Sequence, residues 1–324
     1  MLIEKKFWFL KLYITLIILI YKVNGYDGDD NCNYRCIDPG GGITERKHIM
    51  CLRENNCGII ADRCSNYIKN SLGFDKNEKD QILHLHNDLR NQIALGLKKP
   101  ALPASSNMRK LVWHQELADV TQCYVNACPQ KYKLNVCLDL HGAKIGTNEA
   151  NVPFSNRMEN WVSTWFREQY NFKNIYSNYY ETSFPQLIWA ETQYIGCGKI
   201  IYFSGPHASK MIFVVCSYLP GGKINGLRIY KKGKATTNCP DDSEPDLEYK
   251  GLCAVKSNRM DFDSLVQKHR RASSDPHAAI RLKSVEHSNG TKIKFRSATS
   301  GAEYSKARIN GFMVALLCLR ILYL

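Results

Sequence analysis

Two apolar runs decide the fold of this chain: YIGCGKIIYF at residues 194–203 and MIFVVCSY at residues 211–218. Both runs are rich in β-branched and aromatic residues, a composition that predicts β-strands. A Pro-Gly-Gly turn at residues 220–222 ends the second run. Antiparallel pairing of the two strands would bring Cys197 and Cys216 close together.

The sequence before these strands predicts helices at residues 108–128 and 159–170 and an earlier helix that ends near Gly96. The earliest helix begins with an Asp75-x-x-Glu78 box, in which each side chain can accept from the other residue's backbone N–H. Its apolar residues recur at helical spacing: Ile82, Leu85, Leu89 and Ile93. This pattern predicts an amphipathic helix with one buried face.

Composition excludes several classes of protein. With 324 residues, 44% hydrophobic and 23% charged, the chain suits one medium globular domain with extensions, or two small domains. No stretch of 20 apolar residues lies between the two ends, so no internal transmembrane helix is expected. The formal net charge of +14 is compatible with nucleic-acid binding. Export from the cell, which the next features indicate, instead favours anionic surfaces or acidic glycans as partners.

The two ends carry targeting patterns. Residues 1–25 have a charged start, an apolar run and a small-residue site, which is typical of a secretory signal peptide; a signal anchor is the alternative. Residues 300–302 (Ser-Gly-Ala) precede a polar spacer and an apolar tail, the pattern of a lipid-anchor signal. Processing would remove residues 303–324, including Cys318. The alternative for this tail is an apolar helix that packs on the domain.

The cysteine count agrees with export. A secreted chain pairs its cysteines, and this one has thirteen, of which Cys318 lies in the tail that anchor processing would remove. The other twelve can form six disulfides, and they lie at positions 32, 36, 51, 57, 64, 123, 128, 137, 197, 216, 239 and 253. Zinc is the alternative, because the Cys32-x3-Cys36 and Cys123-x4-Cys128 spacings are loosely finger-like.

Composition also changes along the chain. Residues 26–74 hold five cysteines and a glycine-rich run, so we expect an irregular segment attached to the domain by disulfides. Residues 254–302 are poor in aromatics and rich in Ser, Lys and Arg, which predicts a basic low-complexity tail that does not fold alone. Asn289, in Asn-Gly-Thr, is a glycosylation site in this tail.

Six ordered motifs between residues 78 and 222 resemble the CAP superfamily, the cysteine-rich secretory, venom antigen five and pathogenesis-related proteins. They are His86-Asn-Asp-Leu-Arg90, the run 108–118, Gly146-Thr-Asn148, Trp165-x-x-Glu168, the run 186–198 and the run 215–222. The cysteine spacing of residues 32–58 resembles insect venom antigen five more closely. This resemblance places the CAP domain at residues 75–231 and a cysteine-containing extension at residues 232–253.

The resemblance implies an α+β fold, a three-layer α-β-α sandwich with a disulfide-stapled N-terminal segment. It also implies the disulfides Cys32–Cys51, Cys36–Cys137, Cys57–Cys128 and Cys197–Cys216. Cys239 and Cys253 are expected to pair locally, which leaves Cys64 for Cys123. An exchange between Cys57 and Cys64 stays open, because the spacing departs from the family at this point.

Many CAP proteins place two His and two acidic or amide residues in a cleft, and some bind zinc there. Carried over by motif, these positions fall on His141, Thr147, Glu168 and Ser183. Zinc needs three or four N, S or O ligands, and the hydroxyls of Thr147 and Ser183 are poor ligands at neutral pH. We therefore expect no metal and no cofactor. His141 and Glu168 are expected to form a structural hydrogen-bonded pair.

The cleft also contains the residue types of a hydrolytic triad, Ser183, His141 and Glu168. Ser183 is followed by Phe-Pro and not by the glycine-rich turn of a nucleophile elbow, so no catalytic residue is expected. The resemblance implies a secreted, extracellular, venom allergen-like protein that binds a ligand or partner through its surface or cleft. The alternatives are a lipid or sterol carrier and a metal-dependent or hydrolytic enzyme. Expected partners are an unknown protein or lipid ligand, anionic cell surfaces and, through the anchor, a membrane, but not nucleic acid.

Overall fold

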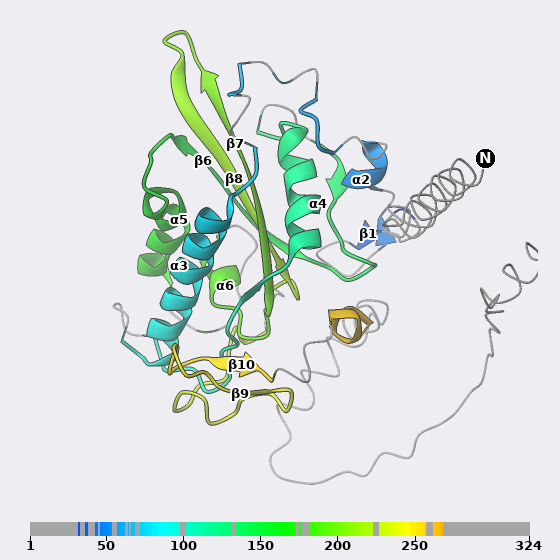
Figure 1. The fold of residues 1–324 in the computed structure, drawn as a ribbon. Helices are drawn as coiled ribbons and strands as arrows, with labels where there is room; N and C mark the ends of the chain where they lie inside the picture. The colour runs from blue at the N-terminus through cyan, green and yellow to red at the C-terminus, as the bar shows by residue number, and fades with distance from the viewer. Residues whose placement is uncertain are drawn as a thin grey trace, which may run out of the picture. The chain divides into compact units, whose positions relative to one another are not determined.

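The computed structural model describes residues 32, 36–37, 43–44, 46–53, 57–61, 64, 66–68, 72–97, 102–130, 134–172, 175, 182–222, 227–256 and 262–267 (Figure 1). The predicted signal peptide, the predicted glycosylation site Asn289 and the predicted anchor signal lie outside the described residues. No helix in these ranges is both long enough and apolar enough to cross a membrane.

A four-stranded sheet forms the centre of the domain, with strand order β4-β7-β8-β6. The strands are β4 (Val112–Trp113), β7 (Tyr194–Ser204), β8 (Ser209–Leu219) and β6 (Gly146–Pro153). β7 and β8 pair antiparallel, as the sequence predicts, and this register places Cys197 opposite Cys216, to which it is joined by a disulfide. β6 pairs antiparallel with β8, whereas β4 pairs parallel with β7.

Helices cover both faces of this sheet (Figure 1). α3 (Lys76–Ala94), α5 (Glu159–Phe166) and α6 (Phe184–Leu187) lie on one face, and α4 (Gln115–Asn126) lies on the other. Side chains alternate between the two layers along β8, so that Val214 packs with the first group and Val215 packs on the α4 side. The fold is thus the predicted three-layer α-β-α sandwich.

Two glycines let α4 pack directly on the backbone of β7. A Cβ atom at Gly196 would lie 2.3 Å from the backbone nitrogen of Ala118, and one at Gly198 would lie 2.8 Å from Cα of Gln122. Real Cβ atoms do not approach backbone this closely, so any larger side chain at either position would push the helix from the sheet.

The first helix begins as predicted. Asp75 Oδ1 accepts from Glu78 N at 2.8 Å, and Glu78 Oε2 accepts from Asp75 N at 2.9 Å. These reciprocal bonds satisfy backbone N–H groups that have no partner in the first turn of α3. At the other end Gly96 adopts a φ of +71°, the left-handed conformation that terminates many helices.

The N-terminal segment is attached to the domain by disulfides and short pairings. β1 (Cys36–Ile37) pairs with β2 (Ile43–Thr44), and β3 (Lys47–His48) pairs parallel with β5 (Val136–Cys137) and leads into α2 (Ile49–Leu52). The disulfides of the structure are Cys32–Cys51, Cys36–Cys137, Cys57–Cys123, Cys64–Cys128, Cys197–Cys216 and Cys239–Cys253.

Two of these disulfides differ from the implied pairs. Cys57 joins Cys123 and not Cys128, and Cys64 joins Cys128 and not Cys123, so the exchange left open by the sequence is the one that occurs. Asn126 Nδ2 donates to Cys57 O at 2.7 Å, and Ala61 N donates to Asn126 O at 2.9 Å, so residues 57–61 lie beside the carboxyl end of α4. Along this end the earlier cysteine is bonded to the earlier partner and the later to the later.

The extension after the sheet folds back on the domain. It contains β9 (Ser243–Pro245) and β10 (Cys253–Val255), which pair with each other. Arg109 Nη2 lies 2.7 Å from Asp242 Oδ1, and Lys110 Nζ lies 2.9 Å from Asp246 Oδ2, so two ion pairs fix the extension to the segment before β4.

Part of the segment that follows the extension packs on the domain. β10 continues to Val255, and residues 262–267 form a further helical turn, with Phe262, Leu265 and Val266 packed on the domain. Val266 is only 3% exposed. These three apolar residues stand at helical spacing, but a short apolar stripe inside a basic segment gives too weak a pattern to predict docking from sequence.

Candidate functional site

The predicted pair of His141 and Glu168 does not form. His141 Nε2 lies 2.8 Å from Glu116 Oε1, in the first turn of α4. His141 has a φ of +47° and is followed by Gly142 at +78°, and this tight turn after β5 directs the imidazole toward α4. The prediction was wrong because it took a motif position without the conformation of the loop that carries it.

Glu168 instead fixes the loop that contains Ser183. It lies in the 3₁₀-helix η3 (Arg167–Asn171), and its Oε2 accepts from the backbone nitrogens of Ser183 and of Phe184, the latter at 2.8 Å. A carboxylate that accepts two backbone N–H bonds at the start of α6 stabilises the entry to that helix. The structure thus brings Glu168 and Ser183 together, but through the Ser183 backbone.

Thr147 lies on β6, and its neighbours alternate between the two faces of the strand. Glu149, two residues along, accepts from Tyr124 Oη of α4 at 3.0 Å, and alternation puts Thr147 on the same face. Asn148 points the other way and its Nδ2 donates to Ser183 O at 3.0 Å. Of the four residues expected in the cleft, His141 and Thr147 therefore belong to the α4 side, while Glu168 and Ser183 belong to the loop before α6.

A buried polar network runs beneath this loop. His86, 1% exposed, donates from Nδ1 to Ile82 O at 2.7 Å, so its Nε2 accepts from Tyr218 Oη at 3.0 Å. Burial lowers the pKa of His86 to about 4 and raises the pKa of Tyr218, so both groups are neutral at physiological pH. The network holds α3 against β8 and offers no ionised group for chemistry.

Arg90 is the other buried group of the same helix, and it is fully enclosed. Its guanidinium donates to backbone carbonyls at distances of 2.8–3.4 Å; they belong to Arg109, Leu187, Trp189, Ala190 and Thr192. Burial lowers the pKa of Arg90 to about 9, which leaves it charged at pH 7. Arg90 therefore organises the loops around α6 and is structural.

Three histidines gather with Glu116 on the opposite side of the sheet. We call His48, His114, His141 and Glu116 the histidine cluster. Burial lowers the pKa of His48 to about 4 and also lowers the pKa of His114, and the charges of Glu116 and His141 act on both rings. Nothing in the sequence marks the cluster, because its members come from β3, the start of α4 and the turn after β5.

The donor set does not fit a metal site. Within the described ranges no group of three or more His, Cys, Asp or Glu side chains is arranged to hold a metal ion. Glu168 is bound to backbone N–H groups and His141 to Glu116, so neither of the strong ligands expected in the cleft faces the other. Thr147 and Ser183 supply only hydroxyls, which bind zinc weakly at neutral pH.

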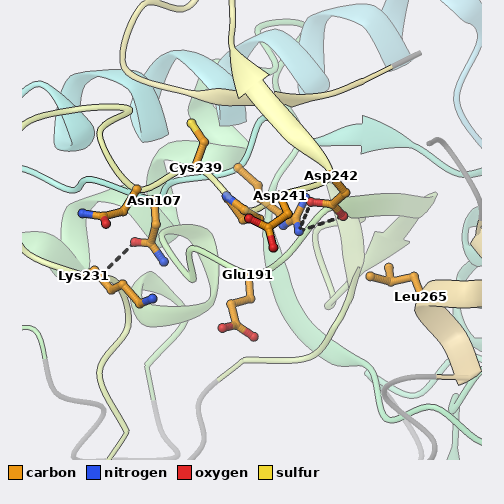
Figure 2. Close-up of a pocket in the computed structure, with 10 residues that line it drawn as sticks. Asn107, Glu191, Lys231, Cys239, Asp241, Asp242 and Leu265 are labelled. Carbon is orange, nitrogen blue, oxygen red and sulfur yellow. Dashed lines mark hydrogen bonds and ion pairs between the residues drawn. The ribbon is translucent and has the colours of Figure 1, made fainter. Parts of the chain in front are cut away.

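A polar cavity of about 570 Å³ opens between the extension and the domain (Figure 2). Exposed charged side chains of Glu191, Lys231 and Asp241 line it, and Arg109, paired with Asp242, lies at its wall. Figure 2 shows Leu265 approaching the cavity from the side opposite Lys231. Sequence analysis missed this cavity, because its lining comes from segments that are far apart in the chain and carry no common motif.

The sequence is similar to one family of known proteins. A profile of the family described as "CAP: Cysteine-rich secretory protein family" matches residues 83–218. Venom allergen 5 of Vespula maculifrons is 32% identical over 238 residues, which cover 69% of this chain and 96% of that protein. Venom allergen 5 of Tityus serrulatus is 28% identical over 246 residues, which cover 67% of this chain and 55% of that protein.

Among solved structures, the crystal structure of NaASP2 with Zn2+ is similar at 25% sequence identity and a TM-score of 0.42. The similarity covers 56% of this chain and 97% of that one. The structure of BmVAL-1 is similar at 21% identity and a TM-score of 0.44, over 56% of this chain and 96% of the other.

Proposed function

Because the chain belongs to the cysteine-rich secretory protein (CAP) family, as a venom allergen 5-like member, we propose that it is a secreted, non-enzymatic binding protein. Its relatives are venom proteins, which supports an extracellular location. Six disulfides support the same location, since such bonds persist in oxidising compartments.

One observation carries the proposal of binding without catalysis: the acid–base residues of the expected cleft are each committed to another structural partner. His141 contacts Glu116, and Glu168 holds the backbone of Ser183 and Phe184. General acid–base catalysis needs such groups within hydrogen-bond reach of one reacting atom. A geometry that separates them supports recognition and not turnover.

The polar cavity supplies a concave surface for that recognition. Glu191, Lys231 and Asp241 surround it, and no hydrogen bond within the described part of the chain engages the side-chain charge of any of the three. Charged, solvated side chains favour a small polar ligand or a polar segment of a partner. This lining gives no support to the alternative of a lipid or sterol carrier, which needs an apolar channel.

The test is a thermal-shift screen of the full chain, secreted from insect cells, against amino acids, amines, sugars and phosphates. A ligand that binds the native state at 100 times its Kd stabilises it by about 2.7 kcal/mol, a shift of several degrees in Tm. The shift should fall in Glu191→Gln and Asp241→Asn and persist in Glu159→Gln, an exposed carboxylate of α5. Native mass spectrometry of the same preparation tests the carrier alternative, since a stoichiometric lipid would support it.

Activity assays test the other half of the proposal. Ester, peptide and glycoside substrates should show no turnover. A hydrolytic activity that His141→Ala abolishes at unchanged Tm would establish an enzyme and overturn the proposal.

A further inference from the structure

The 262–267 segment is held on the domain by stacked rings. The ring of Phe262 lies parallel to the imidazole of His114, with centroids 3.7 Å apart and planes 11° apart. It also meets the ring of Tyr194 edge-on at 5.2 Å and that of His141 at 6.4 Å. Val266, on the same helical turn, is buried. Phe262 and Val266 thus anchor the segment directly above the histidine cluster.

The docked position favours a neutral His114. Its Nδ1 accepts from Leu117 N at 3.4 Å, which makes His114 the N-cap of α4. A protonated imidazole has a donor on each nitrogen and cannot accept this bond. A cation at a helix N-terminus is also opposed by the helix dipole, and Phe262 covers the ring from water. The N-cap bond and the helix dipole oppose the charged form in the docked and undocked states alike, whereas the stacked ring of Phe262 adds a desolvation cost only while the segment is docked.

The charges that face His114 come from every element around it. Glu116 and Asp119 on α4 and Asp263 on the segment favour the protonated form of His114, and His141 opposes it. Burial is the largest effect, and it lowers the pKa of His114. Glu116, Asp119 and His141 remain in place whether or not the segment is docked. Of these charged groups, only Asp263 moves away from His114 when the segment detaches. Asp263 is solvent-exposed, so water and salt screen its attraction to a protonated His114.

We propose that the 262–267 segment is an acid-released clamp: protonation of His114 lets its ring swing into water and detaches the segment from the domain. Leu265 of the same turn lines the polar cavity, so release removes one wall of that cavity (Figure 2). The fold therefore couples mild acidification to the opening of a surface that is partly covered at neutral pH. The inference rests on contacts within this chain and not on the identity of any ligand.

The direction and size of the effect follow from proton linkage. Burial under Phe262 lowers the pKa of His114, so the docked state binds a proton less readily than the undocked state, and docking weakens as pH falls through the ordinary range of histidine. The effect is limited to one proton, so the docking equilibrium cannot change by more than about tenfold per pH unit.

Hydrogen exchange of the full chain, followed by mass spectrometry and corrected for intrinsic rates, measures this equilibrium. The protection factor of amides 262–267 should fall from pH 7.5 to pH 5.0, while amides of β7 keep their protection. Phe262→Ala should expose the segment at both pH values without affecting β7. His114→Asn keeps an N-cap acceptor but cannot titrate, so its segment should exchange equally at both pH values.

His207→Asn is the matched control, because His207 is exposed on the β7–β8 turn and should leave the pH response of the native chain unchanged. Protection of residues 262–267 that is the same at pH 7.5 and pH 5.0 in the native chain would overturn the proposal. So would a pH-dependent loss that persists in His114→Asn, or a Phe262→Ala segment as protected as the native one. Each of these results leaves the ligand-binding function untouched and is thus distinguishable from its failure.

Discussion

Replacing Arg90 by lysine should remove much of the stability of this domain although the charge is kept. Arg90 is completely buried, and its planar guanidinium donates in several directions to five carbonyls of the surrounding loops. A lysine ammonium has three donors clustered at one point. It can satisfy at most three of the carbonyls that the guanidinium reaches.

The size of the loss follows from the groups left behind. At least two of the five carbonyls would lose their bond to Arg90, although Trp189 O and Ala190 O each keep a backbone N–H donor. A hydrogen bond to a charged donor contributes about 1.5–3 kcal/mol, so we expect a loss of about 3–6 kcal/mol. Domains of this kind are stable by only about 5–15 kcal/mol, so the change takes a large share of the total. Only the loops beside α6 lose contacts, whereas the disulfides are untouched.

Urea unfolding at pH 7 without reductant, followed by tryptophan fluorescence, measures the effect. The midpoint should fall without a change in m, because the native surface stays the same. Arg167→Lys, an exposed arginine at the start of η3, is the control and should change stability by less than about 0.5 kcal/mol. An Arg90→Lys protein within about 1 kcal/mol of the native chain would refute the reasoning that a distributed donor is required.

Three further predictions test other parts of the fold. Gly196→Ala should cost about 1–3 kcal/mol, read as a lower Tm, because its Cβ meets the backbone of α4, whereas Gly58→Ala, with open space around it, should not. Mapping of non-reduced peptides should find Cys57 linked to Cys123; a peptide linking Cys57 to Cys128 would contradict the structure. His86 has its pKa lowered to about 4 by burial, so it stays neutral as pH falls below 6.5 while the unfolded chain takes up a proton, and stability is lost between pH 6.5 and 4. Proton NMR should show no titration of His86 near pH 6.5 in the folded protein.

Local sequence patterns predicted the central features of the fold. The runs of β-branched residues predicted β7 and β8. Because the two strands follow each other in the sequence, antiparallel pairing was expected, and it places Cys197 beside Cys216 as the structure shows. The Asp75–Glu78 box is likewise complete within four residues. Features of this kind depend on periodicity and on bonds between near neighbours, and both can be read directly from the order of residues.

The sites needed the tertiary structure. His141 was assigned to Glu168 by motif, but the turn that carries it points the ring at Glu116 on another element. The cavity and the histidine cluster each assemble side chains from several separate segments, and no spacing rule relates those segments.

The sequence by itself therefore determined β7, β8, the start of α3 and the family of this protein, but not β4, which lies within the predicted helix 108–128. Only the tertiary structure decided which cysteine meets which along α4, which partner His141 takes, and that residues 262–267 lie on the domain. The physical reason is that secondary structure follows from short-range periodicity. The pairing of distant side chains instead depends on the direction of a loop, and a change of one backbone dihedral, such as the positive φ of His141, redirects a side chain to a different neighbour.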